Sequence, residues 1–471
     1  MTEAAATMMK LSVAATALHA ELRGADASFS GVSTDSRQVN AGDLFVALAG
    51  EKFDGHDYLD IAAKSGATAA LVHMPIANSP LPLIVCKDTL AALGTLAGYW
   101  RGKFALPLIA LTGSNGKTTV KEMIASVLRA HCDNENAVLA TEGNLNNHIG
   151  MPLTLLKLRT HHRYAVIEMG MNHEGEISYL THIAKPQVAL VNNAQHAHVG
   201  EVGGIEAVAR AKGEIFSGLD ADGMAIINTD DPSEPLWKSL ARKHRALTFG
   251  LTQQADITAK YQLNATGTPM QVHTPRGDFS TLLMVPGEHN ARNALAACAA
   301  AIALEIPLTA IAKGLSQFSG VKGRLQRKPG INGADIIDDT YNANPDSVQA
   351  AIAVLAKSSG KKILVLGDMG ELGADGAKLT AQLGTDAKQA GIDVLFTLGE
   401  LSVNAARAFG DGAKKFADLD GLVATLAPML DAKTVVLVKG SRFMRMERVV
   451  DAIARPNLSA AVGTLDAKES K

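Results

Sequence analysis

The order of hydrophobic and polar positions along the chain predicts an α/β protein. The N-terminal part contains short apolar runs, which predict buried strands, and stretches with apolar residues three and four apart, which predict helices. The apolar runs lie at residues 44–48, 69–72 and 83–85, and the helical stretches at 58–65 and 88–100. We therefore expect residues 1–105 to form a small N-terminal α/β domain.

A second domain is predicted to begin near residue 106, where the pattern changes. Residues 108–111 form a buried-strand run before a glycine-rich turn and a long helical stretch, and residues 165–167 and 188–191 form similar runs. Runs this apolar suit a parallel sheet buried on both faces, and strand–helix alternation predicts a doubly wound core. Residues 255–286 alternate in polarity and predict an antiparallel insertion in the same domain, which we place at residues 106–321.

Glycines and charges at residues 319–324 predict a second linker. Four strand candidates follow, each with a helical pattern after it, at residues 335–337, 362–366, 394–398 and 434–438. This alternation predicts a Rossmann-like C-terminal domain over residues 322–456, followed by a polar tail at 457–471. We expect hinges between domains near residues 105 and 322.

Composition and charge exclude several classes of protein. The 471 residues include 45 Lys plus Arg against 47 Asp plus Glu, a net charge of −2, so no basic field is present to hold nucleic acid. Cys86, Cys132 and Cys298 lie far apart and form no Cys-x-x-Cys pattern, which excludes a disulfide framework and a structural zinc site. No apolar run reaches the ~20 residues that cross a bilayer, and the N-terminus lacks a secretory-signal pattern. We therefore expect a cytoplasmic protein without a transmembrane segment.

The glycine-rich turn after residues 108–111 predicts a phosphate loop for ATP, because it lies between a strand and a helix. Its residues are Thr112, Gly113, Ser114, Asn115, Gly116, Lys117, Thr118 and Thr119. The glycines let successive N–H groups face an anion, and the helix adds the positive end of its dipole. Lys117 would bind the β- and γ-phosphates, and the Thr118 hydroxyl would bind Mg²⁺. Leu111 stands where the standard motif has its first glycine, and the alternative is a glycine-rich connection with an incidental lysine.

Polar residues after the next two strands are further candidates, because ligands of a parallel sheet gather at the carboxyl ends of its strands. Glu168 ends the second strand and is either a magnesium ligand or a solvated carboxylate. His196 and His198 follow the third strand, where a histidine either serves phosphate or metal or lies on the surface. From the residues alone, Lys212 in the next helical stretch is simply a lysine on a helix face.

Three more candidates lie later in the chain. Asn290 precedes an alanine-rich helix, where it is an N-cap, a ligand of a nucleotide base, or both. Arg324 in the second linker is either a cation for the γ-phosphate or a solvated side chain. The strand that ends at Asp338 and Asp339 leads into polar residues that suit a ribose or a phosphate-bound cation. The alternative is a strand-to-helix turn that Asn344 caps.

Six blocks occur in the order found in the Mur ligases, ATP-dependent amide-forming enzymes of peptidoglycan synthesis, and the chain resembles this family over nearly its whole length. The blocks are residues 33–37 with 42–48, 112–118, 143–150, 168–172, 366–373 and 439–444. The family's own variant of the phosphate loop accounts for Leu111. The blocks at 143–150 and 366–373 resemble the branch that adds a dipeptide, and the Asp-Asn-Pro-Arg motif of diaminopimelate-adding MurE enzymes is absent.

The resemblance implies roles for individual residues. Four would be catalytic: Lys117, His198, Lys212 and Arg324. Lys212 stands where the family carries a carbamylated lysine, whose added carboxylate binds a second Mg²⁺, and the other metal ligands would be Thr118, Glu168 and His198. His289, Asn290, Arg324 and Asp339 would bind ATP together with the phosphate loop. The UDP-linked substrate would contact Thr34, Ser36, Arg37, Asn144, Asn146 and Asn147.

The implied reaction joins UDP-N-acetylmuramoyl-tripeptide to D-alanyl-D-alanine through an acyl phosphate, with ATP and two Mg²⁺ ions. The implied fold has an N-terminal uridine-nucleotide domain, a central P-loop-type ATPase domain with a mostly parallel sheet, and a C-terminal Rossmann-like domain. The alternatives are a MurE-type or folylpolyglutamate-synthetase-type ligase, and an ATP-binding switch that does not ligate. The third residue of the tripeptide and the residues that bind the dipeptide stay open. So does the oligomeric state, for which a monomer is favoured.

Overall fold

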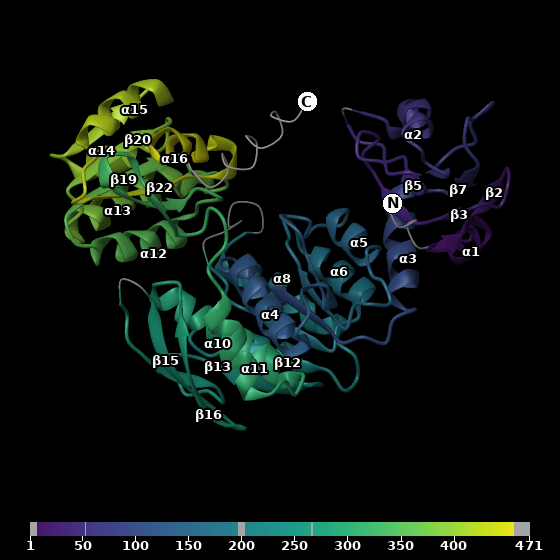
Figure 1. Ribbon diagram of the computed structural model, residues 1–471, viewed down its shortest axis with the longest axis horizontal. Helices are drawn as coiled ribbons and strands as arrows, with labels where there is room; N and C mark the ends of the chain where they lie inside the picture. Colours follow the sequence, from purple (N-terminus) through teal and green to yellow (C-terminus); the bar gives the residue numbers. More distant parts are fainter. Residues whose placement is uncertain (1–6, 52, 196–202, 265–266, 456–471) are drawn as a thin grey trace, which may run out of the picture.

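The computed structural model describes residues 7–51, 53–195, 203–264 and 267–455. The N-terminal and C-terminal parts lie on either side of a middle part that carries the phosphate loop (Figure 1). Each part has its own mostly parallel sheet with helices packed against it. The predicted α/β class with three domains is therefore confirmed.

The N-terminal sheet has five strands in the order β2-β7-β6-β5-β4. The strands are β2 (Glu21–Arg23), β4 (Gly31–Ser33), β5 (Asp43–Val46), β6 (Ala69–Val72) and β7 (Leu83–Val85). All neighbours are parallel except β2 and β7, and β1 (Met9–Lys10) pairs separately with β3 (Ser28–Phe29). The helices are α1 (Leu11–Ala17), α2 (Leu59–Lys64) and α3 (Thr89–Arg101). The strands and helices that we expected are present. Strands β1 to β4 were not predicted, because they are too short to give a periodic pattern of apolar residues.

The middle sheet has six parallel strands in the order β13-β12-β11-β8-β10-β9. The strands are β8 (Leu108–Thr112), β9 (Val138–Ala140), β10 (Tyr164–Glu168), β11 (Val188–Val191), β12 (Met224–Asn228) and β13 (Arg245–Phe249). In the register of the sheet Glu168 pairs with Leu111, and Val191 pairs with Thr112. The carboxyl ends of β8, β10 and β11 therefore meet where the phosphate loop begins.

Seven helices of the described residues accompany this sheet. They are α4 (Lys117–Cys132), α5 (Gly150–Leu155), α6 (Glu176–Ala184), α8 (Ile205–Gly213), α9 (Glu234–Leu240), α10 (Glu288–Ala303) and α11 (Leu308–Gln317). The alanine-rich helix α10 is buried along nearly its whole length in the same core as α4 and α11. Small side chains let α10 lie close to the sheet, which places its first turn beside the phosphate loop.

The expected antiparallel insertion is present as a separate three-stranded sheet. Its strands are β14 (Thr258–Tyr261), β15 (Thr268–Thr274) and β16 (Gly277–Leu283), and both pairings are antiparallel. One side chain of β16 contacts α11, because the Thr281 hydroxyl donates to the carbonyl of Ala312 at 3.1 Å. The insertion thus extends the core of the middle domain.

The C-terminal sheet has the order β17-β18-β22-β19-β20-β21. Its strands are β17 (Gln326–Pro329), β18 (Asp335–Asp339), β19 (Lys361–Gly367), β20 (Val394–Leu398), β21 (Ala413–Phe416) and β22 (Thr434–Lys439), and its helices are α12 (Pro345–Ala356), α13 (Gly376–Gln389), α14 (Val403–Phe409), α15 (Leu419–Leu426) and α16 (Glu447–Ile453). Separate hydrophobic clusters cover its two faces. The four predicted strands are confirmed. The two edge strands β17 and β21 were not predicted, because half-exposed polar strands lack an apolar run.

A single hydrophobic cluster joins the N-terminal and middle domains, running from Leu11 through Leu96 to Leu108 and Leu155. Arg101, which is 5% exposed, ties the junction together. Its guanidinium donates to the carbonyls of Ala184, Phe104 and Leu106 at 3.1, 2.6 and 3.2 Å. A shared core does not suit the hinge that we expected near residue 105.

Arg101→Met is therefore expected to lower the free energy of unfolding by about 3 kcal/mol, because three buried carbonyls lose charged donors. Chemical denaturation followed by circular dichroism measures this change. Arg23→Met is the matched control, since Arg23 is half-exposed and forms a surface ion pair with Glu21 at 2.9 Å; its cost should stay below about 1 kcal/mol. Equal costs for the two variants would show that the junction does not depend on Arg101.

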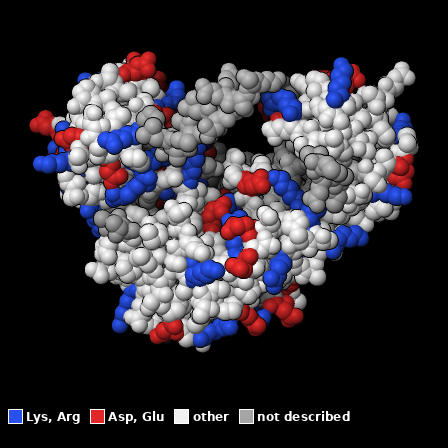
Figure 2. All heavy atoms as spheres, viewed as in Figure 1, with Lys and Arg blue, Asp and Glu red and all other residues white. Residues whose placement is uncertain are grey.

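No helix among the described residues combines the length and apolar character that a membrane span requires; the longest, α4 and α10, have 16 residues each. On the face drawn in Figure 2, basic and acidic side chains are interspersed over all three domains. This distribution agrees with the near-zero net charge.

Candidate active site

The phosphate loop connects β8 directly to α4, as predicted. Gly116 has φ of +79°, and a Cβ there would lie 2.6 Å from Oδ1 of Asn293 and 2.7 Å from Nδ2 of Asn192. Both the left-handed backbone and the lack of space require glycine at this position. Asn193 holds the loop from the end of β11: its carbonyl accepts from the Ser114 N–H at 3.0 Å, and its Oδ1 accepts from the Asn115 N–H at 2.8 Å.

The side chain of Lys117 folds back over the loop. Its Nζ donates to the carbonyl of Gly113 at 2.7 Å and to that of Ser114 at 3.2 Å. Burial lowers the pKa of Lys117, while the nearby carboxylate of Glu168 acts in the opposite direction. The lysine thus lies inside the loop, where an anion held by the loop would meet its charge.

Thr118 and Glu168 meet beside this lysine, and both are buried, at 8% and 2% exposure. The Thr118 hydroxyl donates to Oε2 of Glu168 at 3.0 Å, and Asn146 donates to Oε1 at 2.8 Å. The solvated-carboxylate alternative for Glu168 is therefore wrong. Arg324 reaches the same point, because its Nη2 donates to the Thr118 hydroxyl at 3.0 Å.

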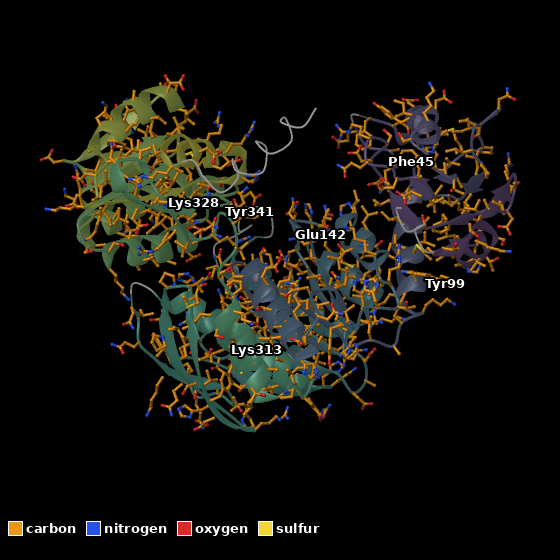
Figure 3. All side chains as sticks on the ribbon, in the orientation of Figure 1. Phe45, Tyr99, Glu142, Lys313, Lys328 and Tyr341 are labelled. Atoms are coloured by element: carbon orange, nitrogen blue, oxygen red, sulfur yellow. The ribbon has the colours of Figure 1, made fainter. Side chains whose placement is uncertain are left out.

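Arg324 comes from the linker to the C-terminal domain, and its guanidinium lies over the ring of Tyr341 at 4.4 Å. Figure 3 labels Tyr341 at the edge of the C-terminal domain nearest the middle domain. The buried Nε of Arg324 has no hydrogen-bond partner among the described residues. The guanidinium is therefore held in place and keeps a donor for a ligand, so the alternative of a solvated side chain is wrong.

A second contact crosses between the two domains at the phosphate loop. The amides of Asn115 and Asn344 donate to each other's oxygens at 3.3 and 2.8 Å. Asn344 is also the N-cap of α12, in a capping box with Ser347, as one of our two readings of this segment predicts. The first turn of α12 is thereby fixed against the loop.

A cleft of about 940 Å³ lies between the middle and C-terminal domains. It is lined by many of the predicted site residues: Ser114, Asn115, Gly116, Lys117, Thr119, Asn144, Asn146, Glu168, His289, Asn290, Arg324 and Asp339. Two other predicted residues do not line the cleft and make structural contacts instead. The buried Thr112 hydroxyl donates to the carbonyl of Met169 at 2.8 Å, and the exposed Asn147 accepts from the N–H of Gly150 at 2.8 Å. Asp339 accepts from the ammonium of Lys439 at 2.6 Å.

The first turn of α10 forms another wall of the cleft. The N-cap is Gly287, and Asn290 lies inside the helix with its Nδ2 donating to the carbonyl of Pro286 at 2.7 Å. The N-cap alternative for Asn290 is therefore wrong, because the helix begins at Glu288, two residues before Asn290. Burial lowers the pKa of His289 to about 4, so this imidazole is neutral at pH 7.

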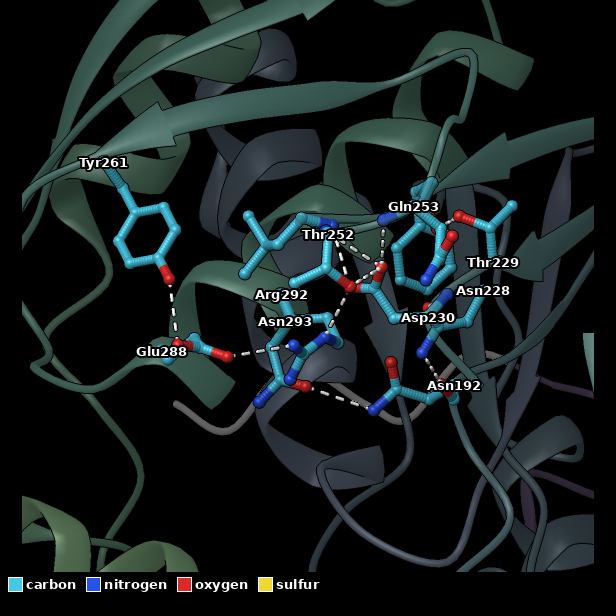
Figure 4. A network of polar contacts seen from close by, with 12 residues as sticks. Asn192, Asn228, Thr229, Asp230, Thr252, Gln253, Tyr261, Glu288, Arg292 and Asn293 are labelled. Carbon is cyan, nitrogen blue, oxygen red and sulfur yellow. Dashed lines mark hydrogen bonds and ion pairs between the residues drawn. The ribbon is translucent and has the colours of Figure 1, made fainter. Parts of the chain in front are cut away.

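Figure 4 shows a polar network behind this turn that the sequence did not predict. Arg292 donates to Asp230 at 2.9 Å and to Glu288 at 3.1 Å, and the Tyr261 hydroxyl donates to Glu288 at 2.9 Å. Asp230 also accepts backbone N–H groups from Leu251, Thr252 and Gln253. The network joins the end of β12 to the insertion and to α10. The apolar run of β12, with Asp230 two residues after it, was the signal that we missed.

Lys212 lies on α8, in the helical stretch that we predicted, but its side chain is buried at 1% exposure. Burial lowers the pKa of Lys212 well below its usual value, and the charge of Lys117 lowers it further. Burial and the neighbouring charge of Lys117 thus both disfavour the protonated form of this amine. His196 and His198 lie outside the described residues.

The three N-terminal candidates lie together after β4 and do not line the cleft. Arg37 forms a two-bond pair with Asp35 at 2.9 and 2.7 Å, which lowers the pKa of Asp35 to about 2. The Ser36 carbonyl accepts from the hydroxyl of Ser65 at 3.4 Å, and Thr34 lies between β4 and this pair. A substrate that touches both these residues and the cleft must be long.

Comparison with known proteins gives the class of this chain. Three family models match it: "Mur ligase family, catalytic domain" over residues 28–99, "Mur ligase middle domain" over residues 111–301, and "Mur ligase, glutamate ligase domain" over residues 323–442. The chain belongs to the Mur ligase family.

Relatives with one name match nearly the full length. One relative is the Escherichia coli (strain K12) enzyme named UDP-N-acetylmuramoyl-tripeptide--D-alanyl-D-alanine ligase. It is 43% identical to this chain, and the match covers 93% of this chain and 96% of the relative's length. A crystal structure of MurF from Acinetobacter baumannii has a TM-score of 0.88 at 37% identity and covers 94% of this chain and 98% of its own. The MurF ligase from Thermotoga maritima in complex with ADP has a TM-score of 0.79 at 28% identity and covers 90% of this chain and 96% of its own.

Proposed function

We propose that this protein is an ATP-dependent ligase that joins D-alanyl-D-alanine to UDP-N-acetylmuramoyl-tripeptide, with ADP and phosphate as products. The observation that carries the proposal is the meeting of Lys117, Thr118, Glu168 and Arg324 at one point of the interdomain cleft. The E. coli relative and the MurF neighbours support the choice of substrates over the MurE-type and folylpolyglutamate-type alternatives. The same relatives are named as ligases, which argues against a switch that hydrolyses ATP without ligation.

In this proposal the tripeptide carboxylate attacks the γ-phosphorus of ATP, and ADP leaves with the electrons of the broken bond. The amine of the dipeptide then attacks the acyl phosphate and phosphate leaves, with loss of one proton from nitrogen. Two anions must approach each other in the first step, so Lys117 and Arg324 offset their repulsion. The T. maritima neighbour with ADP supports ATP as the nucleotide. His289, Asn290 and Asp339 would contact it from the cleft walls.

The donor set beside the loop fits Mg²⁺. Among the described residues no group of three or more His, Cys, Asp or Glu gathers, but the Glu168 carboxylate and Thr118 hydroxyl are 3.0 Å apart and buried. Mg²⁺ prefers oxygen ligands and shares its shell with phosphates and water, so few protein ligands suffice. When bound, the ion would neutralise phosphate charge. His198 stays a predicted ligand.

Lys212 would hold a second Mg²⁺ once its amine carries a carbamate. The uncharged form of the amine, which burial favours, attacks carbon dioxide and loses one proton from nitrogen, so that a neutral amine becomes a carbamate anion. We also propose that Thr34, Ser36, Arg37, Asn144, Asn146 and Asn147 serve the UDP-linked substrate. The proposed domain boundaries are residues 1–105, 106–321 and 322–456, and the three free cysteines suit the cytoplasm.

Phosphate release tests this function directly. With ATP and Mg²⁺ present, release should require both UDP-N-acetylmuramoyl-tripeptide and D-alanyl-D-alanine, and omission of either should reduce the rate by about a hundredfold. Mass spectrometry of the nucleotide product should show the tripeptide extended by two alanines. Release of phosphate at the full rate without the dipeptide would identify an ATPase instead.

A further inference from the structure

Helix α4 carries a buried lysine that the proposed mechanism does not use. Lys121 lies one turn after Lys117 and is 1% exposed, and it does not line the cleft. A lysine is almost never fully buried unless its ammonium is paired. Here the Nζ of Lys121 donates to the carbonyl of Thr141 and lies 2.9 Å from Oε1 of Glu122. Lys121 therefore binds the segment that follows β9.

Thr141, which is 1% exposed, interrupts the regular pairing between β9 and β10. Its N–H donates to the carbonyl of Val166 at 3.1 Å, as in a parallel ladder. The next bond of such a ladder would run from the N–H of Glu168 to the carbonyl of Thr141. That N–H instead donates to the Thr141 hydroxyl at 2.9 Å, while the carbonyl accepts from Lys121. Lys121 thus takes the carbonyl out of the ladder, and the hydroxyl replaces it.

This exchange of partners fixes Glu168 at the end of β10. Its backbone is held by Thr141 on one side and by the pairing with Leu111 of β8 on the other. Its carboxylate accepts from Thr118 at 3.0 Å and from Asn146 at 2.8 Å. The loop that carries Asn146 begins at Thr141, directly after β9. A shift of Thr141 would therefore move both the carboxylate and its amide partner.

Stability of the sheet alone does not explain this arrangement. Burial of an ammonium is costly, and a regular ladder would satisfy the same N–H and carbonyl without a buried lysine. The departure occurs at Glu168, whose side chain lines the cleft. Departures from local rules are expected at functional sites, where the position of one group matters more than the stability of the element that carries it.

We propose that Thr141 and Lys121 are positioning residues for the Glu168 carboxylate as a ligand of Mg²⁺, an inference that rests on the proposed function. Neither side chain lines the cleft. Thr141 fixes the backbone that carries the carboxylate, and Lys121 fixes Thr141. Removal of a group that orients a metal ligand from behind typically lowers metal affinity by roughly ten- to a hundredfold.

The test measures how much Mg²⁺ strengthens the binding of a non-hydrolysable ATP analogue. Isothermal titration calorimetry gives the dissociation constants with Mg²⁺ and with EDTA, and their ratio is the gain due to the ion. Thr141→Val should reduce this gain by roughly tenfold, because the N–H of Glu168 loses its acceptor. The constant measured with EDTA should stay at the wild-type value. In phosphate release, the free Mg²⁺ concentration that gives half of the maximal rate should rise by roughly tenfold, with an unchanged KM for the UDP-linked tripeptide.

Three further variants separate positioning from stability. Thr141→Ser retains the hydroxyl and should keep the wild-type gain, whereas Lys121→Met should lower it, because the freed carbonyl of Thr141 can return to the ladder. Thr181→Val is the matched control: Thr181 is buried on α6, its hydroxyl donates to the carbonyl of Ile215 at 2.9 Å, and the variant should keep the full gain.

Two results would overturn the inference, and they differ in what else they remove. If Thr141→Val keeps the gain of the wild-type enzyme, or loses no more of it than Thr181→Val does, the positioning role is wrong and the proposed function stands. If the wild-type enzyme binds the analogue no more tightly with Mg²⁺ than with EDTA, the magnesium site of the proposed function fails before the variants are compared.

Discussion

Lys117→Ala is expected to abolish ligation, with a fall in kcat of about a thousandfold or more, equivalent to about 4 kcal/mol of transition-state stabilisation. The ammonium lies within the phosphate loop, 2.7 Å from the carbonyl of Gly113, where it would face charge that develops on the γ-phosphoryl group. Binding of the UDP-linked substrate should persist, because three of its six predicted ligands, Thr34, Ser36 and Arg37, lie in the N-terminal domain, outside the cleft. Coupled phosphate release measures the first effect, and isothermal titration calorimetry measures the second.

Lys313→Ala is the control for a lost surface lysine, since Lys313 lies half-exposed on α11 and is labelled in Figure 3. It should have wild-type kcat. Lys117→Arg should also be nearly inactive, because a planar guanidinium does not replace the compact ammonium that folds back onto the carbonyls of Gly113 and Ser114. Near-normal phosphate release by Lys117→Ala, with both substrates present, would falsify the role of this lysine.

Lys212→Ala is expected to lower kcat by roughly a hundred- to a thousandfold. The physical reason is the loss of the carbamate that we propose on the buried amine, whose low pKa keeps it reactive toward carbon dioxide. Wild-type enzyme depleted of carbon dioxide should lose activity and regain it when bicarbonate is added. A short carboxylate such as formate should restore part of the activity of Lys212→Ala, because it supplies the missing anion.

Lys238→Ala is the matched control, because Lys238 is half-exposed on α9 and pairs with Glu234. This variant should respond to neither bicarbonate nor formate. Mass spectrometry of the native protein at neutral pH should find one carbamate, and the modification should be absent from Lys212→Ala. Full activity of Lys212→Ala without any added carboxylate would remove the carbamate from the mechanism.

Much of the architecture was predictable because it is encoded locally. The buried strands at 69–72, 188–191 and 394–398 were predicted to the residue. A short, continuous apolar run bounded by turns is typical of a buried strand. The phosphate loop was equally predictable, because its glycines and Lys117 act through neighbouring backbone groups. The edge strands β17 and β21 were not, since a strand with one neighbour tolerates polar side chains.

The site itself depends on contacts between distant segments. Arg324 and Thr118 are 206 positions apart and meet at 3.0 Å, and Asn115 and Asn344 are 229 positions apart. The helix that carries Lys212 was predictable from the sequence. The burial of its side chain, which lowers its pKa, depends on how that helix packs. By itself the sequence determined the elements and the loop chemistry, because these follow from residues close in the chain. The tertiary structure alone decided which charges are buried together, because burial and pairing depend on how separate sheets and their linkers pack.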